Sequence, residues 1–199
     1  MGLEMLKVYL FFLIFRLPLA FVLDWLLGDP AWLPHPVVFF GRMISRLEAL
    51  FRGVFPATKG GELFAGALLA AVVCSYAFCL PLLVLYLLVF FALRLHLPWL
   101  FYAALLLDLF WGSQCLAARC LKDEAEGVLS GLSRSLEDAR SAVGRIVGRD
   151  TEKLTEAGVI RAAVETVAEN FSDGVAAPLL YLVLGGAPLA LCYKAINTM

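Results

Sequence analysis

Four residues near the end of the sequence, Glu165, Glu169, Asn170 and Asp173, could together bind a divalent cation. Arg161, Glu165 and Glu169 are spaced four residues apart, and Asn170 and Asp173 follow directly. Residues at this spacing share one face of a helix, so the two glutamates would be neighbours. Carboxylate and amide oxygens of this kind suit Mg²⁺, which binds one or two carboxylates together with substrate phosphates. A solvated helix face, on which Arg161 relieves the repulsion between the glutamates, is the alternative that spacing leaves open.

Two arginines precede this acidic segment. Arg145 and Arg149 lie four residues apart, before the predicted helix that carries the glutamates. Guanidinium groups bind phosphate oxygens with paired hydrogen bonds. If a cation is held by the acidic segment, these arginines are therefore candidates for holding the phosphates beside it.

A second polar segment lies near the start of the chain, over residues 23–42 (LDWLLGDPAWLPHPVVFFGR). Asp29 falls in a Gly-Asp-Pro turn signal, and a proline on each side holds His35 in an extended stretch. The two tryptophans of the segment suit a membrane interface. The segment is therefore either a membrane-surface loop with anchoring aromatics or a second wall of the site, built from Asp29, His35 and Arg42.

The composition requires an apolar environment for most of the chain. Apolar residues make up 62% of the sequence and charged residues 17%, against about 45–50% and 25% in soluble domains. This places the protein in the membrane class. The formal charge of −1 indicates no nucleic-acid partner. The five cysteines show no CxxC spacing and are interpreted as small apolar residues.

The membrane spans are predicted from uncharged or weakly charged runs, over residues 8–28, 63–93 and 97–118. The second run is longer than a bilayer requires, so we expect it to tilt, or to bend at Pro81. Residues 174–193 are also uncharged, but two prolines and a Gly-Gly pair interrupt them. We therefore expect a broken or re-entrant segment there. The fold class is all-α, a multi-pass membrane protein.

The charge of the connections predicts their side of the membrane. Four Lys and Arg residues fall in the loop 29–62, and eight fall in residues 119–173. With three spans before residue 119, both regions lie on one side, which the positive-inside rule makes cytoplasmic, with the N-terminus outside. Residues 119–173 are expected to form a helical module, with helices over 121–132, from Ser135 onward, and over about 155–170.

Residues 23–42 and the run from Gly148 to Met199, which reads GRDTEKLTEAGVIRAAVETVAENFSDGVAAPLLYLVLGGAPLALCYKAINTM, resemble the CobD/CbiB family. These are adenosylcobinamide-phosphate synthases of cobalamin biosynthesis. The resemblance implies an enzyme of the cell (cytoplasmic) membrane whose active site faces the cytoplasm. It would join a carboxylate of adenosylcobyric acid to the amine of aminopropanol or its phosphate, using ATP and Mg²⁺. No Walker motif or glycine-rich phosphate loop is present, so ATP would bind in another way.

The resemblance also implies roles for residues within the two matching segments. Glu165, Glu169 and Asp173 would be the catalytic and metal-binding residues, with Asn170 as a helper. Arg149 and Arg161 would hold phosphates. The remaining candidates for substrate or phosphate binding are Asp29, His35, Arg42, Lys194 and Asn197. On this assignment, Glu165→Gln abolishes turnover, and unchanged turnover would remove the assignment.

The resemblance also bears on the extent of the site and on the alternatives. The family continues beyond the segment that ends here at Met199, so we expect a C-terminally truncated member whose site is incomplete. A membrane sensor or regulatory protein of the AmpE type is the main alternative, and it has no need of the acidic and basic cluster. A CDP-alcohol phosphotransferase is the other, from the spacing of Asp173, Gly174 and Ala176, but no further acid follows Asp173.

Overall fold

The fold is described from a computed structural model, which covers residues 2–28, 30, 32, 34–148 and 150–199. Within these ranges the chain forms helices and connecting turns, with no strand. In chain order they are α1 (Gly2–Leu27), α2 (Pro36–Val54), α3 (Lys59–Arg94), α4 (Pro98–Ser113), α5 (Ala118–Leu132), α6 (Leu136–Gly144), α7 (Glu156–Phe171), the π-helix η1 (Ser172–Ala176) and α8 (Ala177–Thr198). The predicted all-α class is confirmed.

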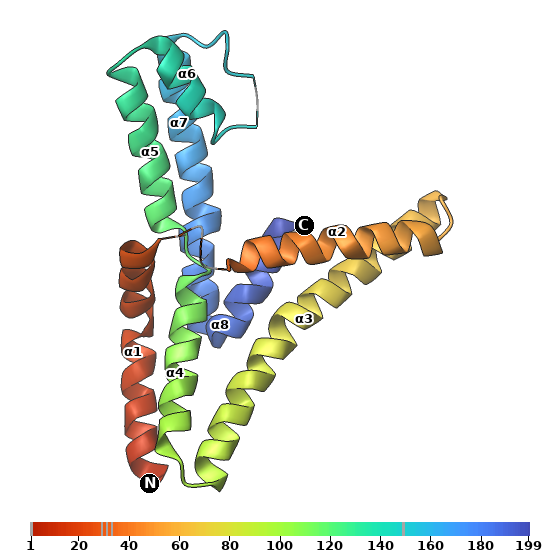
Figure 1. Cartoon of the computed structure of the whole chain (residues 1–199), viewed down its shortest axis with the longest axis vertical. Coiled ribbons are helices and arrows are strands. Elements are labelled where there is room, and N and C mark those ends of the chain that lie inside the picture. The colour runs from red at the N-terminus through yellow and green to blue at the C-terminus, as the bar shows by residue number, and fades with distance from the viewer. Residues whose placement is uncertain (1, 29, 31, 33, 149) are drawn as a thin grey trace.

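Four helical segments are long and apolar enough to cross a membrane, which confirms the multi-pass architecture. They are Leu3–Leu27, Lys59–Arg94, Pro98–Leu132 and Glu156–Thr198. The N-terminus and the turn between α3 and α4 lie at one end of the molecule, whereas α2 and the α5–α7 module lie toward the other (Figure 1). The two regions rich in Lys and Arg therefore share one end, as the sequence predicted. The cellular side that this end faces stays a prediction.

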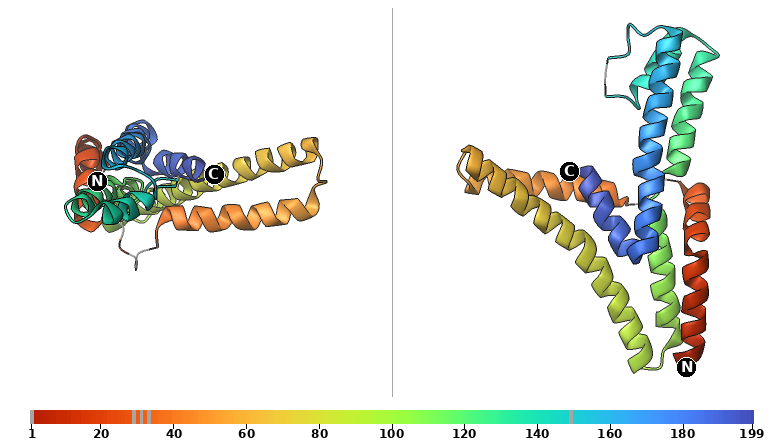
Figure 2. Two further views of the ribbon diagram at one scale, coloured as in Figure 1. Left: turned by 90° about the horizontal axis from the view of Figure 1, so that it is seen from above. Right: turned by 180° about the vertical axis from the view of Figure 1, so that it is seen from behind.

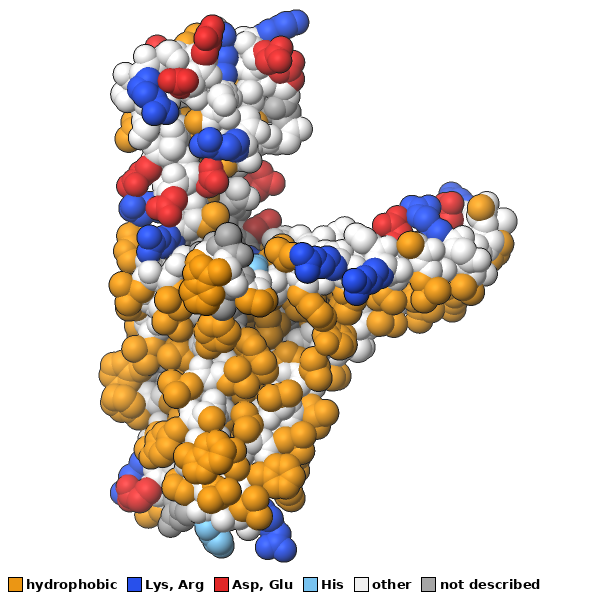
Figure 3. Space-filling model, viewed as in Figure 1, with side chains coloured by type: hydrophobic (Ala, Val, Ile, Leu, Met, Phe, Trp, Pro, Cys, Tyr) orange, Lys and Arg blue, Asp and Glu red, His pale blue; other side chains and the backbone are white. Residues whose placement is uncertain are grey.

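The surface divides into an apolar part and a charged part between the same two ends of the molecule. The half built from α1, α3, α4 and α8 is covered by apolar side chains, and charged side chains gather on the α5–α7 module (Figure 3). Lys7 and Asp24, which lie near the two ends of α1, are 17 residues apart. At a rise of 1.5 Å per residue this is about 25 Å, close to the thickness of a bilayer core.

The helix α3 is longer than a bilayer span requires, and it is inclined to α4. Its 36 residues would span about 54 Å at a rise of 1.5 Å per residue, well beyond a core of about 30 Å. The helix leans away from α4 and stays one continuous element (Figure 1). Pro81 lies buried inside it without ending it. The helix continues through the proline at which a bend was expected, and its tilt in a bilayer stays a prediction.

The stretch predicted as a loop over residues 29–62 is mostly helical, and that part of the prediction is wrong. Pro36 begins α2, a helix of 19 residues, and His35 caps it by accepting a hydrogen bond at Nδ1 from the Val37 amide, at 3.3 Å. His35 itself is extended, as expected. A proline at the first helical position needs no amide partner, so the Pro signals that suggested a loop mark a helix start instead.

The α5–α7 module has its own small core. Val128, Val143 and Val159 meet there with three alanines, all buried. The two predicted helix starts are confirmed: the Ser135 hydroxyl caps α6 and the Thr155 hydroxyl caps α7, each accepting from an amide three residues on. The module therefore stands as a packed unit above the end of α1 (Figure 1).

Candidate functional site

A cavity of about 200 Å³ lies where the start of α5 meets the junction of α7 and α8. We call it the α7–α8 cavity. It is lined by Ala117, Cys120, Leu121, Glu124, Ile146, Asn170, Asp173, Gly174, Lys194 and Asn197. Four predicted site residues therefore meet at one place, because the end of α7 and η1 bring Asn170 and Asp173, and the end of α8 brings Lys194 and Asn197.

A π-helical turn sets the position of Asp173. In a regular α-helix the Gly174 carbonyl would accept a hydrogen bond from residue 178, but that residue is Pro178 and has no amide hydrogen. The helix widens to a π turn over Ser172–Ala176, and the Gly174 carbonyl accepts from the Ala117 amide at 2.9 Å. This bond ties the start of α5 to the wall of the cavity. Such π turns often mark functional sites.

Lys194 is the most unusual residue of the cavity. It is only 8% exposed. Within the described part of the chain, no side chain forms an ion pair or a hydrogen bond with its ammonium group. A buried cation without a partner is costly, and the cost falls when an anion binds. The Asp173 carboxylate faces the same cavity and interacts with the Tyr193 hydroxyl.

The second half of α8 reaches the cavity because α8 is broken. Gly185 and Gly186 leave helical geometry, and Gly186 has φ of 70° and ψ of −165°. The two halves of α8 form a hairpin, so the chain turns back toward the level of α2 (Figures 1 and 2). Tyr181 and Tyr193 stack across it with ring centroids 4.7 Å apart. A break was predicted here; whether the hairpin re-enters a bilayer stays a prediction.

Two buried charges from other helices hold this break. Arg16 of α1 donates hydrogen bonds to the carbonyls of Leu182 and Val183, which end the first half of α8. Asp108 of α4 accepts from the Ala187 amide at 2.9 Å, at the start of the second half. The two side chains also pair, with Arg16 Nη1 3.4 Å from Asp108 Oδ2. Each end of the interrupted helix thus receives the partner that its free backbone groups require.

Sequence reasoning treated Arg16 and Asp108 only as interruptions of two apolar spans. Both are at least 90% buried. The signal that could have found them is their position, because ionisable residues inside membrane spans are costly and are normally paired or used. Glu124 and Cys120 were also missed. They lie on α5, outside both polar segments that the sequence singled out.

The glutamates of α7 lie on an exposed face. Glu165 and Glu169 are exposed and do not line the α7–α8 cavity. Arg161 pairs with Glu165, with Nε 2.7 Å from Oε1, which is the geometry of the solvated-face alternative. Across the described residues, no three His, Cys, Asp or Glu side chains are grouped so that they could hold a metal ion. A metal role for Glu165 and Glu169 stays a prediction.

Two of the N-terminal candidates, His35 and Arg42, do not line the α7–α8 cavity. His35 lines a different, largely apolar cavity of about 270 Å³ between α2, α3, α4 and α8. Arg42 is exposed on α2. Asp29 and Arg149 fall outside the described residues. The structure therefore does not bring His35 or Arg42 together with Lys194, and their predicted substrate roles stay predictions.

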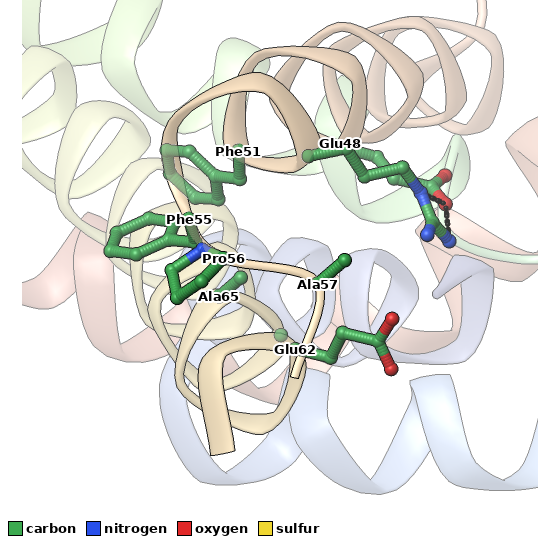
Figure 4. Close-up of a pocket in the computed structure, with 9 residues that line it drawn as sticks. Glu48, Phe51, Phe55, Pro56, Ala57, Glu62 and Ala65 are labelled. Carbon is green, nitrogen blue, oxygen red and sulfur yellow. Dashed lines mark hydrogen bonds and ion pairs between the residues drawn. The ribbon is translucent and has the colours of Figure 1, made fainter. Parts of the chain in front are cut away.

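A further cavity of about 320 Å³ lies at the far tip of the α2–α3 hairpin. Glu48 and Glu62 reach it from the two helices beside Phe51 and Phe55, and Glu48 pairs with Arg52 at 2.7 Å (Figure 4). It contains none of the predicted site residues. The α7–α8 cavity is therefore the stronger candidate, because it gathers four of them around a buried cation.

Comparison with known proteins identifies the family. The family model described as CobD/CbiB protein matches residues 17–199. The chain belongs to the CobD/CbiB family. The match includes both polar segments and every residue that lines the α7–α8 cavity.

Relatives of this CobD/CbiB chain are named as cobalamin biosynthesis proteins. It is 42% identical to CobD of Clostridium acetobutylicum, covering 91% of this chain and 55% of the relative. It is 44% identical to CobD of Geobacter metallireducens, covering 90% and 53%. It is 39% identical to CbiB of Salmonella typhimurium, covering 91% and 54%. The chain thus spans about half the length of the curated relatives it matches. No solved structure matches it.

Proposed function

We propose that this chain carries part of the active site of a cobalamin-biosynthesis enzyme that forms an amide at the expense of ATP. The carboxylate would come from adenosylcobyric acid, and the amine from aminopropanol or its phosphate. Family membership supports the pathway. The observation that carries the site is the largely buried side chain of Lys194, which lines the α7–α8 cavity together with Asp173, Asn170 and Asn197.

Lys194 would bind an anionic oxygen of a substrate. Its side chain is largely buried and no described carboxylate pairs with it, so a positive charge stands in a partly enclosed space. Both ATP and the carboxylate substrate are anions, and charge stabilisation in such a space is stronger than in water. A carboxylate is a poor acyl donor, so it must be activated, commonly by phosphoryl transfer, before an amine displaces the activating group. A fixed cation beside the transferred group serves that step.

The cavity also suits Mg²⁺. Asp173 and Glu124 supply carboxylates, and Asn170 and Asn197 supply amide oxygens. These are hard oxygen ligands, and Mg²⁺ takes one or two carboxylates with the rest of its shell from phosphates and water. When bound, the ion would neutralise phosphate charge. Asp173 and Glu124 would hold it, and Asn170 and Asn197 would orient the polar groups around it.

The test is amide formation in membranes that contain the full-length gene product carrying these residues. The reaction is supplied with adenosylcobyric acid, aminopropanol phosphate, ATP and Mg²⁺, and the product is followed by mass spectrometry. We expect product only when ATP and Mg²⁺ are both present. Asp173→Asn and Lys194→Met should each lower the rate about 100-fold. Glu156→Gln, which changes an exposed acid at the start of α7, should stay within about twofold of the wild type.

The two possible failures differ. If the wild type forms no product with either amine, the enzyme assignment is wrong and a regulatory membrane protein of the AmpE type becomes the better interpretation. If the wild type is active and the Asp173 and Lys194 variants match it, the reaction stands and the α7–α8 cavity is not its site.

A further inference from the structure

The helix α2 lies across the molecule. It runs at a steep angle to α1 and α4, at the level where α1 ends and α5 begins (Figures 1 and 2). In the space-filling view, Lys and Arg side chains follow its length directly above a band of apolar side chains (Figure 3). This level separates the apolar half of the protein from the charged module, so α2 lies where a bilayer would have its headgroups.

One edge of α2 combines exposed apolar and basic residues. Phe39, Arg42, Arg46 and Leu50 follow one another at spacings of three and four residues, which places them along one edge of the helix. Phe39 is 48% exposed and Leu50 57% exposed. The neighbouring face is occupied, because Phe40 is buried in the core beneath the helix. The exposed edge therefore carries both apolar and basic side chains.

The two arginines of this edge have no acidic partner. In the described ranges, neither Arg42 nor Arg46 forms an ion pair or a hydrogen bond through its side chain. Arg52, on the same helix, donates two hydrogen bonds to Glu48, at 2.9 and 2.7 Å. Two adjacent unpaired guanidinium groups beside exposed apolar side chains fit an anion whose other end is apolar.

We propose that this edge of α2 binds the phosphate groups of anionic phospholipids. Arg42 and Arg46 would bind the headgroup oxygens, and Phe39 and Leu50 would lie among the upper parts of the acyl chains. The inference does not depend on the α7–α8 cavity, because neither arginine lines it. It predicts a preference for anionic over zwitterionic lipid, and a dependence of that preference on ionic strength.

The test compares lipid retention by the detergent-solubilised full chain, measured by native mass spectrometry. Phosphatidylglycerol and phosphatidylcholine with the same acyl chains are added separately. We expect the wild type to retain phosphatidylglycerol more strongly, and added salt to weaken this retention. An arginine near an anionic surface contributes a factor of about five, so Arg42→Gln/Arg46→Gln should lower phosphatidylglycerol retention about 25-fold. Arg52→Gln is the matched control on the same helix and should change it less than about twofold.

Three outcomes would overturn the proposal. The first is equal retention of phosphatidylglycerol by the wild type and the double Gln variant. The second is retention that does not respond to salt. The third is displacement of the lipid by inorganic phosphate beyond that caused by chloride at the same ionic strength, which would indicate a site for soluble anions. If the Gln variant loses helix content by circular dichroism, Arg42→Lys/Arg46→Lys replaces it, and its preference for phosphatidylglycerol should persist because both charges remain.

Discussion

Asp24 and Arg119 cap each other's helices. The Asp24 carboxylate, near the end of α1, accepts hydrogen bonds from the Ala118 and Arg119 amides at 3.0 and 3.3 Å. The Arg119 guanidinium, in the first turn of α5, donates to the carbonyls of Trp25 and Leu26 at 3.0 and 2.8 Å. The residue before α5 is Ala117, which has no side-chain oxygen to serve as a cap. The acid of one helix therefore replaces the missing cap of the other.

This arrangement predicts the effect of removing the carboxylate. Asp24→Leu leaves two amides of α5 without an acceptor at a buried position, and we expect a loss of about 2 kcal/mol of stability. Asp24→Asn keeps one acceptor oxygen and should lose about half as much. Thermal unfolding in detergent, followed by circular dichroism, measures both. Equal stability of the Leu variant and the wild type would contradict the capping role.

The buried pair of Arg16 and Asp108 predicts an unusual double-variant result. Arg16→Met or Asp108→Leu should each cost about 3 kcal/mol, because each leaves a charge without its partner in an apolar region. Removing both removes the unpaired charge. The backbone groups of Leu182 and Ala187 still lose their partners, so we expect the double variant to remain well below the wild type. Full recovery of stability in the double variant would show that the two charges only neutralise each other and do not cap the backbone groups at the α8 break.

Gly186 is predicted to tolerate no side chain. Its φ of 70° disfavours other residues, and an added Cβ would lie 3.0 Å from both Arg16 Nη1 and Asp108 Oδ1. Gly186→Ala should therefore destabilise the protein by about 2 kcal/mol or more. Gly66→Ala is the control, since nothing lies within 4 Å of its added Cβ and alanine favours a helix. Unfolding in detergent should show the two variants moving in opposite directions.

Lys194 is expected to lower the stability of the protein and to support its activity. Lys194→Met removes a buried charge that has no counter-ion in the described structure, so the unfolding temperature should rise. Amide formation should fall at the same time, because the anion-binding group is lost. A purely structural lysine would show both quantities falling together. Lys194→Arg keeps the charge and should retain part of the activity.

Local signals in the sequence predicted local structure well. Ser135 and Thr155 marked helix starts because a hydroxyl cap needs only amides two or three residues away. The Gly-Gly pair marked the α8 break because no other residue type adopts φ of 70° as easily. The prolines around His35 correctly predicted its extended backbone. They did not show that Pro36 begins a helix, since a proline at a first helical position and a proline in a loop look alike in sequence.

The candidate site could be predicted only in part, because its walls come from distant segments. Asn170, Asp173, Lys194 and Asn197 were named from two polar runs near the end of the chain. Glu124 was not, because no local signal in the sequence shows that α5 packs beside the α7–α8 junction, where the Ala117 amide donates to the Gly174 carbonyl. The π turn also shifts Asp173 relative to Glu165 and Glu169, so a face drawn at regular helical spacing does not describe all three.

The Arg16–Asp108 pair also constrains the order in which the protein assembles during synthesis. The two residues are 92 positions apart, so α1 leaves the ribosome long before α4 exists. A single arginine at the middle of an inserting helix costs about 2.5–3.5 kcal/mol. Until α4 arrives, α1 must keep that guanidinium near water or beside the insertion machinery. The guanidinium of the first helix thus lacks its final partner until the third apolar helix is made, and the α8 hairpin, which both charges cap, forms only after both.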